Sequence, residues 1–451
     1  MSWRKSNILN YFAGQDTPPW RAVLLANVPV AAILLAMIPI GRVLEDNLDP
    51  YYLRVVMLIG FNIILAVSLQ LINGFSGQFS LGHAGFMAVG AYLAGFPALQ
   101  YSKDFNDPST TLIFFISLLI AVGLGAAVLW MFFLGMRRTR HVHRSLPGIL
   151  LMVLLVWIVT DFAVASKYQH PPFWAFWSLL ADSLQGLFGS MMNLLGPMAA
   201  SISAAMPGAV RRPLCFIVLL YGAGCCASAV GFIVGLPALR LRGDYLAIAT
   251  LGFGEIIRIA IQNSRPLGGA LGLTSIPKYT DFTWLYVVVI ITIVAIWRIA
   301  YSSKGRAIMA VREDEIAASS IGVNTTTFKV MAFTIGAFFA GIAGALFSLH
   351  EQSISPYQFG VVKSIEPVVM VTLGGLGSIS GAILAAIVLT LLPEVLRDIS
   401  PQDRMVIYSL LLVVMMILRP QGLLGGRELW PRRRGPLRSP APACSERAVP
   451  V

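Results

Sequence analysis

The sequence predicts an all-α polytopic integral membrane protein, and three observations lead to this fold class. Of its 451 residues, 57% are hydrophobic and only 12% are charged, whereas soluble domains carry roughly 25% charged residues. Mean hydropathy is +0.76. The apolar residues come in long runs, and about twenty helical residues cross a hydrocarbon core of about 30 Å. This composition excludes a soluble enzyme, a disordered chain and a disulfide scaffold.

The apolar runs define the candidate spans. Two of them contain glycine clusters that can break a helix, so we expect Phe79–Leu99 and Pro367–Leu392 to be broken or re-entrant. The second contains the run GGLGS at Gly374–Ser378. The full set of candidates is Ala22–Gly41, Leu53–Ile72, Phe79–Leu99, Thr111–Gly135, Pro147–Ala165, Leu214–Leu236, Tyr245–Ile261, Trp284–Ala300, Phe328–His350, Pro367–Leu392 and Met405–Leu418.

The net charge of +12 indicates membrane topology rather than nucleic-acid binding, because Lys and Arg gather in short loops and in the tail. The loop Arg137–Arg144, the loop carrying Lys304 and the tail Arg419–Arg438 are therefore expected inside the cell. Three single crossings between the Lys304 loop and the tail would leave the tail outside. One segment must be split, and we favour a split at GGLGS.

The motifs of common catalytic sites are absent from the sequence. It contains no GxxxxGK[ST], HExxH, GxSxG or CxxC pattern, and its histidines are scattered. We therefore expect no catalytic residues, no metal site and no cofactor bound by this chain.

Ionisable residues inside a span raise a functional hypothesis by default. Glu255 and Arg258 lie three residues apart, on one face of a helix, and can pair. They form either a structural ion pair or part of a gate or pathway. Asp161 has no neighbour of this kind, and His83 is expected to pack or hydrogen-bond inside the bundle. The small residues Gly336, Ala340 and Gly344 predict close helix packing.

A polar segment, Ser302–Phe333, interrupts the apolar pattern between two spans. Its composition predicts a helix over roughly Arg306–Ile321 that ends near Gly322, a suitable C-terminal cap. Asn324 could start the next span. An exposed helix of this kind is a rigid element that can enter a groove on a soluble partner.

Four blocks of the sequence resemble the membrane subunit of the branched-chain amino-acid ABC importers. Arg312–Ala318, REDEIAA, is similar to the coupling motif of importer permeases, although Ile316 occupies the usual Glu position. The other blocks are Asn73–Gly95, Gly235–Ile259 and Val369–Leu392. The resemblance stops between about Asp104 and Arg212, where we expect an insertion with one or two extra spans.

The resemblance implies an ABC importer permease bundle of about ten transmembrane helices in the bacterial inner membrane, surrounded by lipid. A second permease subunit would pair with this chain, and two ATPase subunits carrying ATP and Mg would dock on the coupling helices. A periplasmic binding protein would deliver leucine, isoleucine or valine. No nucleic acid is expected as a partner.

The resemblance also assigns residues. Coupling to the ATPase would involve Arg312, Glu313, Asp314, Glu315, Ala317, Ala318 and Gly322. Apart from the resemblance, the glycines and ionisable residues of the spans give the candidate pathway or gate residues, which are Gly77, Gly82, His83, Gly85, Glu255, Arg258, Gly374, Gly375 and Gly377.

Seven regions follow from this interpretation. They are a cytoplasmic N-terminal segment (1–21), an N-terminal membrane part (22–103), the insertion (104–212), a central membrane part (213–301), the coupling loop (302–327), a C-terminal membrane part (328–418) and a basic, disordered tail (419–451).

Other functions remain open from the sequence. The same importer class could carry urea or short amides, because specificity would lie mainly in the binding protein. An ion-coupled secondary carrier would need intramembrane carboxylates, and only Asp161 and Glu255 qualify. Such a carrier would also leave the Lys304–Gly322 helix without a role. A membrane-embedded enzyme lacks any visible catalytic constellation.

Overall fold

The computed structural model describes residues 19–101, 208–241, 243–264 and 267–397, together with several residues between 407 and 428. The regular secondary structure of these residues is helical, apart from an isolated β-bridge between Leu273 and Ile354, and irregular segments connect the helices. The candidate spans Thr111–Gly135 and Pro147–Ala165, the loop Arg137–Arg144 and nearly all of the expected insertion lie outside the described residues.

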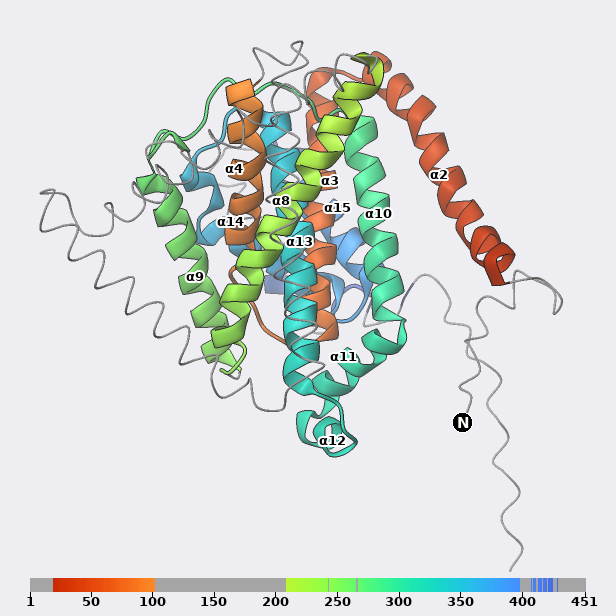
Figure 1. Cartoon of the computed structure of the whole chain (residues 1–451), viewed down its shortest axis with the longest axis vertical. Coiled ribbons are helices and arrows are strands. Elements are labelled where there is room, and N and C mark those ends of the chain that lie inside the picture. Colours follow the sequence, from red (N-terminus) through yellow and green to blue (C-terminus); the bar gives the residue numbers. More distant parts are fainter. Residues whose placement is uncertain are drawn as a thin grey trace, which may run out of the picture.

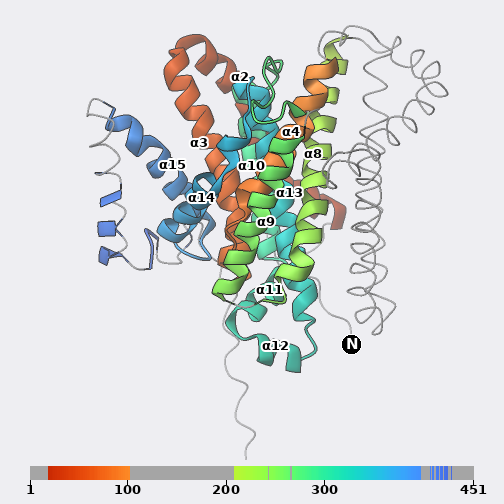
Figure 2. The same ribbon diagram turned by 90° about the vertical axis from the view of Figure 1, so that its left-hand side faces the viewer.

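The helices pack as a bundle, with α12 projecting from one end (Figures 1 and 2). In chain order they are α2 (Pro19–Asn47), α3 (Pro50–Leu69), the π-helical turn η1 (Gln70–Phe75), α4 (His83–Tyr101), α8 (Gly208–Ala238), α9 (Asp244–Asn263), α10 (Phe282–Ala300), α11 (Ser303–Glu313), α12 (Glu315–Ser320), α13 (Thr325–Glu351), the 3-10 helix η3 (Pro356–Phe359), α14 (Val361–Gly374) and α15 (Ile379–Val395).

Four helical segments of the described part are long and apolar enough to cross a membrane. They are Pro50–Phe75, Leu219–Ala238, Phe282–Ala300 and Thr325–Glu351. Two shorter apolar helices, His83–Leu99 and Ile379–Val395, accompany them. The chain is thus a helical, multi-pass protein, while the number of about ten spans stays a prediction.

The centre of the bundle is formed by α3 and α13. Every residue of α3 from Ile59 to Leu69 is buried, as expected for a helix that is apolar all round. Helix α13 packs against α4, α8 and α3. Arg54 at the start of α3 forms an ion pair of 3.0 Å with Glu351 at the end of α13, so these two helices run in opposite directions.

Small residues bring the central helices together, as the spacing predicted. A Cβ atom on Gly336 would meet the side chain of Ile72, and one on Gly344 would meet the backbone of Met87. Gly90 of α4 similarly faces the backbone of Gly341. These glycines lie in close contacts between helices, and van der Waals packing of this kind is a main source of helix association in lipid.

The expectation of a broken Phe79–Leu99 span is wrong in its position. Helix α4 is continuous from His83 to Tyr101, through Gly85 and Gly95. The irregular backbone lies before it, at 76–82. Gly85 and Gly90 inside α4 face α9 and α13, so they permit close approach while the intrahelical hydrogen bonds persist.

The split at GGLGS is confirmed. Helix α14 ends at Gly374 and α15 begins at Ile379. Gly375 and Gly377 between them have φ angles of 107° and 90°, a region that glycine enters readily and other residues avoid. The two helices pack against each other and so form a hairpin (Figure 2).

The split also explains at which end of the bundle the start of the tail lies. Glu428 accepts a hydrogen bond of 2.8 Å from the backbone N–H of Ile379 and one of 3.4 Å from the hydroxyl of Tyr301. The backbone N–H of Leu423 donates to Leu373 O at 2.7 Å. The start of the tail therefore lies at the same end of the bundle as the segment that carries Lys304, as the charge pattern predicted.

Candidate functional site

The segment predicted to couple to a partner, called the coupling segment below, consists of α11 and α12 at one end of the bundle (Figure 1). Helix α11 begins at a side-chain cap, because Ser302 Oγ accepts from the backbone N–H of Gly305 at 3.1 Å. Gly305 sits directly against the backbone of Ala300, which permits a tight turn after α10. Ile308 and Val311 are buried and fix α11 to the bundle.

One continuous helix was expected here, and the structure corrects this to two helices separated at Asp314. The Asp314 carboxylate accepts from the backbone N–H groups of Ile316 at 2.8 Å and Ala317 at 3.0 Å. This capping bond starts a new helix and competes with continuation of the old one.

The end of α12 is also capped, as the sequence predicted. The N–H of Gly322 donates to Ser319 O, and the N–H of Val323 donates to Ala318 O, both at 3.0 Å. Gly322 has a φ of 86°. This is the Schellman arrangement, which glycine favours.

Helix α12 exposes apolar side chains at the tip of the molecule. Only Ala318 of this helix is buried, while Ile316 is 74% and Ile321 is 79% exposed. Glu315 forms an ion pair of 2.8 Å with Lys329 at the start of α13. The tip is thus an apolar projection attached to the longest central helix.

Arg312 is turned inward, away from this tip. Its Nη1 atom donates to the carbonyl oxygen of Gly74, at the end of η1. A Cβ atom on Gly77 would lie 2.8 Å from Arg312 Cγ, and one on Gly377 would lie 2.9 Å from Nη1. The structure therefore brings together three predicted site residues from separate blocks of the sequence. Glu313 beside it is 78% exposed in its side chain.

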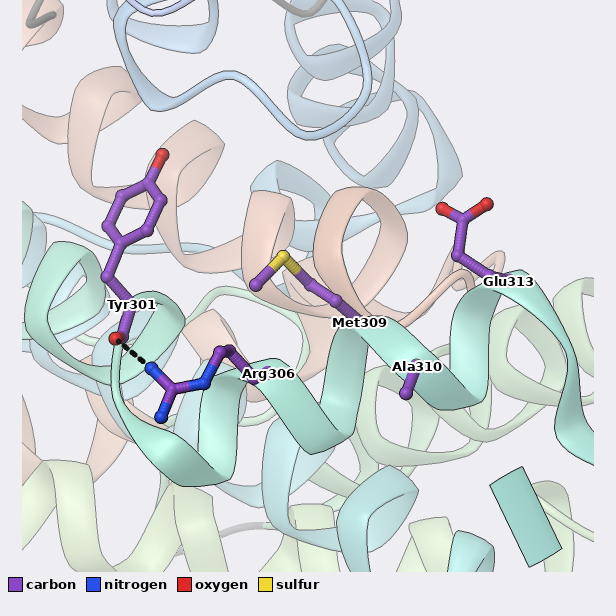
Figure 3. A pocket seen from close by; sticks show the side chains of 5 residues that line it. All are labelled: Tyr301, Arg306, Met309, Ala310 and Glu313. Atoms are coloured by element: carbon purple, nitrogen blue, oxygen red, sulfur yellow. Dashed lines mark hydrogen bonds between the residues drawn. The ribbon is translucent and has the colours of Figure 1, made fainter. Parts of the chain in front are cut away.

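An open pocket of about 510 Å³ lies on α11 and is lined by Tyr301, Arg306, Met309, Ala310 and Glu313. Figure 3 shows Arg306 curled back toward Tyr301, where its Nη1 donates to the Tyr301 carbonyl oxygen at 3.3 Å. Of these five residues, the sequence predicted only Glu313 as a site residue.

Gly82 and Gly85 lie where α4 crosses α9. A Cβ atom on Gly82 would meet the backbone of Thr250, and one on Gly85 would lie 2.9 Å from the Cα atom of Gly254. Gly374 packs in the same way on the backbone of Gly381. These glycines have a demonstrable packing role, and their assignment to a pathway stays a prediction.

His83 is fully buried and hydrogen-bonded, as expected. Its Nε2 lies 2.8 Å from Ser68 Oγ, and the Ser68 hydroxyl donates to Leu65 O at 2.9 Å. Since the hydroxyl has one proton, the ring nitrogen is the donor to Ser68. This contact ties the start of α4 to α3.

Glu255 and Arg258 form the expected ion pair, at 2.7 Å. Arg258 Nη1 also donates to Gln262 Oε1 at 3.1 Å, and Gln262 donates to the hydroxyl of Tyr357 at 3.1 Å. Tyr357 belongs to η3, which follows the end of α13. This polar cluster thus lies toward the opposite end of the bundle from α11 and α12, and the structure does not join it to the Arg312 contacts.

Buried amides near the helix breaks were missed by the sequence analysis. Gln70 Nε2 donates to the carbonyl oxygens of Gly375 at 3.0 Å and Ser378 at 3.2 Å. Several buried side-chain atoms in this stretch have no hydrogen-bond partner within the described part of the chain: Gln70 Oε1, Asn73 Nδ2, both polar atoms of Gln78, Ser80 Oγ and His83 Nδ1. Polar amides within an otherwise apolar run were the signal that could have identified them. Among the described residues, no His, Cys, Asp and Glu group is placed to hold a metal ion.

Comparison with known proteins identifies relatives of the chain. A family model described as "Branched-chain amino acid transport system / permease component" matches residues 51–171 and 184–419. The match includes most of 104–212, beyond the blocks on which the resemblance rested. No solved structure matches the chain.

Individual relatives agree with the family model. The high-affinity branched-chain amino acid transport system permease protein LivM of Salmonella typhimurium is 41% identical, over 45% of this chain and 56% of that protein. LivM of Escherichia coli gives the same values. The permease protein LivH of Escherichia coli is 35% identical, over 29% of this chain and 42% of that protein. The chain thus spans about half the length of the LivM relatives it matches. Because the family model covers most of the sequence, the chain belongs to the family of permease components of branched-chain amino acid transport systems.

Proposed function

We propose that this chain forms the transmembrane path of an ATP-driven importer for leucine, isoleucine and valine. The membership in the permease family supports the transport class. The names of the 41% identical relatives support the branched-chain amino acid substrate. The chain itself carries out no bond chemistry in this proposal, and hydrolysis of ATP with Mg belongs to separate subunits.

The observation that carries the ATPase coupling is the exposed tip of α12. Ile316 and Ile321 expose 74% and 79% of their surface. They lie on the part of the chain that projects past the apolar helices of the bundle (Figure 1). Caps at both ends make this short helix rigid. A rigid apolar projection fits a groove on a soluble subunit, as in helix-in-groove recognition.

The substrate path is proposed to run beside the irregular segment between η1 and α4. Buried polar atoms without partners are expensive in an apolar bundle, at about 1–3 kcal/mol each. Asn73 and Gln78 offer uncharged donors and acceptors there, which suit a zwitterionic solute with an apolar side chain. Gly82, His83 and Gly85 border this segment.

The assembly follows from the same proposal. Two ATPase subunits dock on coupling helices, and one of them takes α12 of this chain. A second permease of the same family completes the path, consistent with the similarity to LivH. A periplasmic binding protein delivers the solute, and the complex resides in the bacterial inner membrane.

Radiolabelled leucine uptake tests the function. Cells that lack the gene should lose high-affinity uptake and regain it when the gene is restored. Unchanged leucine uptake, together with loss of urea or amide uptake, would contradict the branched-chain assignment and keep the importer class.

The coupling is tested by Gly322→Asp. At a φ of 86° with open space around it, this substitution strains the cap of α12 without a clash elsewhere. We expect uptake to be abolished while the protein still inserts. Gly243→Asp is the matched control, because Gly243 also has a positive φ, of 58°, and open surroundings, but lies outside the coupling segment. Normal uptake with Gly322→Asp would refute the assignment.

A further inference from the structure

We infer that Arg312 is a positioning residue that links the coupling segment to two helix breaks inside the membrane part. This inference rests on the proposed importer function, which it deepens. The sequence resemblance places Arg312 among the residues that meet the ATPase. Apart from an ion pair of 3.8 Å with the neighbouring Glu313, the contacts of its side chain point instead into the permease.

The first break is the end of η1. A carbonyl group at the end of a helix has no intrahelical partner, and the Gly74 carbonyl accepts its hydrogen bond from Arg312. The aliphatic part of the arginine packs on Gly77, whose φ is 69°. A side chain at position 77 would therefore both strain the backbone and displace the arginine.

The second break is the GGLGS loop between α14 and α15. The same guanidinium lies against Gly377, because a Cβ atom there would come within 2.9 Å of Nη1. The φ of Gly377 is 90°. One side chain from α11 thus contacts two irregular segments that lie about three hundred residues apart in the sequence.

The two breaks also hold each other. Gln70 of η1 donates to the carbonyl oxygens of Gly375 and Ser378, and a Cβ atom on Gly74 would lie 2.8 Å from Gly377 N. They therefore form one packed unit. A displacement of α11 would therefore move both breaks through the Arg312 side chain. The breaks border the buried amides of the proposed path.

Other contacts of the coupling segment lead to continuous helices rather than to the two helix breaks. Glu315 of α12 pairs with Lys329 of α13, a continuous helix. Ile308 and Val311 of α11 are buried against the bundle. Within the described part of the chain, Arg312 is the residue of the coupling segment whose side chain meets the irregular backbone of both breaks. Flexible glycine segments can change conformation, whereas a packed helix moves as a rigid body.

Hydrogen exchange of the purified permease in nanodiscs tests the link without any transport. Arg312→Ala should speed amide exchange at least tenfold in peptides covering 70–82 and 374–381, and Arg312→Lys should lie between it and the native protein. Arg306→Ala is the matched control on the same helix, because among the described residues the Arg306 side chain bonds to the nearby Tyr301 carbonyl and to neither break. Unchanged exchange in Arg312→Ala, or equal acceleration in Arg306→Ala, would overturn the inference.

The assembled importer provides the second test. With Arg312→Ala we expect the ATPase subunits to co-purify at the native level, and uptake to fall at least tenfold. ATP hydrolysis should no longer be stimulated by the binding protein. Loss of co-purification would instead make Arg312 a docking residue and overturn the inference. Native uptake would overturn it as well.

A substitution on the opposite side of the contact tests the link independently, in case the arginine variants misfold. Gly377→Ala should reproduce the uncoupling, because its methyl group displaces the guanidinium. Gly252→Ala is the control, since a Cβ there meets nothing within 4 Å. Coupled transport in Gly377→Ala would contradict the link.

Failure of the native complex to transport or to bind any ATPase would refute the proposed function instead. The hydrogen-exchange result would still hold in that case.

Discussion

Glu428 binds the first turn of α15 through Ser380. Its Oε2 atom accepts from the Ser380 hydroxyl at 2.8 Å and from the Ser380 backbone N–H at 3.2 Å. Its Oε1 atom accepts from the backbone N–H of Ile379 at 2.8 Å. A carboxylate at a helix N-terminus is favoured by the helix dipole and by free N–H groups. This residue therefore attaches the start of the tail to the GGLGS hairpin.

Removing this carboxylate should loosen the tail. Charge-assisted hydrogen bonds contribute about 1.5–3 kcal/mol, so Glu428→Ala should lower the thermal midpoint in detergent by several degrees. Glu428→Gln should have a smaller effect because it keeps acceptor capacity. Limited proteolysis should also cut the region 407–428 faster in Glu428→Ala. An unchanged cleavage rate would contradict the attachment.

Gly90 is expected to be intolerant of any side chain. A Cβ atom there would overlap the backbone of Gly341, so Gly90→Ala must push α4 and α13 apart. Overpacking of this kind typically costs about 1–3 kcal/mol. Fluorescence-detected size-exclusion chromatography should show a lower yield and a lower thermal midpoint. Gly252→Ala should behave as the native protein, and equal behaviour of the two variants would refute the close crossing.

Ser68→Ala should destabilise the start of α4. The substitution leaves the His83 Nε2–H group buried without an acceptor, at a cost of about 1–3 kcal/mol. The measurement is thermal unfolding in a double-mutant cycle with His83→Leu. Because the second substitution removes the unpaired donor, the double variant should lose less stability than the sum of the two single variants. Strict additivity would show that the contact carries no energy.

Charge reversal should test the attachment of α12 to α13. Glu315→Lys and Lys329→Glu each place like charges together, and each should weaken co-purification of the ATPase several-fold. The exchanged pair should recover most of it. Glu315 and Lys329 are partly buried, with side-chain exposures of 31% and 16%, so the pair should be less screened than a surface pair. Failure of the exchange to rescue binding would show that the ion pair does not position α12.

Local patterns were sufficient for much of the fold. The apolar runs located α3, α8, α10 and α13 close to their observed bounds, because burial in lipid or in a bundle demands continuous apolar residues. The cap at Gly322 was predictable, since its hydrogen bonds join residues within one turn. The break at Asp314 was equally local, yet the capping role of an aspartate inside a helical pattern was not recognised.

The candidate site was predictable in its residues but not in its arrangement. The Glu255–Arg258 pair follows from helix periodicity and is confirmed. The glycines of α4 suggested a break, whereas the structure shows Gly90 and Gly85 facing Gly341 and Gly254 across helix crossings. A glycine pattern alone does not distinguish these cases, because both the flexibility of a break and the closeness of a crossing select for a missing side chain.

By itself the sequence determined the membrane class, the family resemblance and the position of the coupling segment, because these depend on composition and on contacts along the chain. Only the tertiary structure decided the direction of Arg312, the burial of Gln78 and the attachment of Glu428. The hydrogen-bond partner of Arg312 lies 238 residues away, and those of Glu428 lie 48 to 127 residues away. Such contacts exist only after distant helices have packed, so no local pattern of residues encodes which backbone group a side chain will reach.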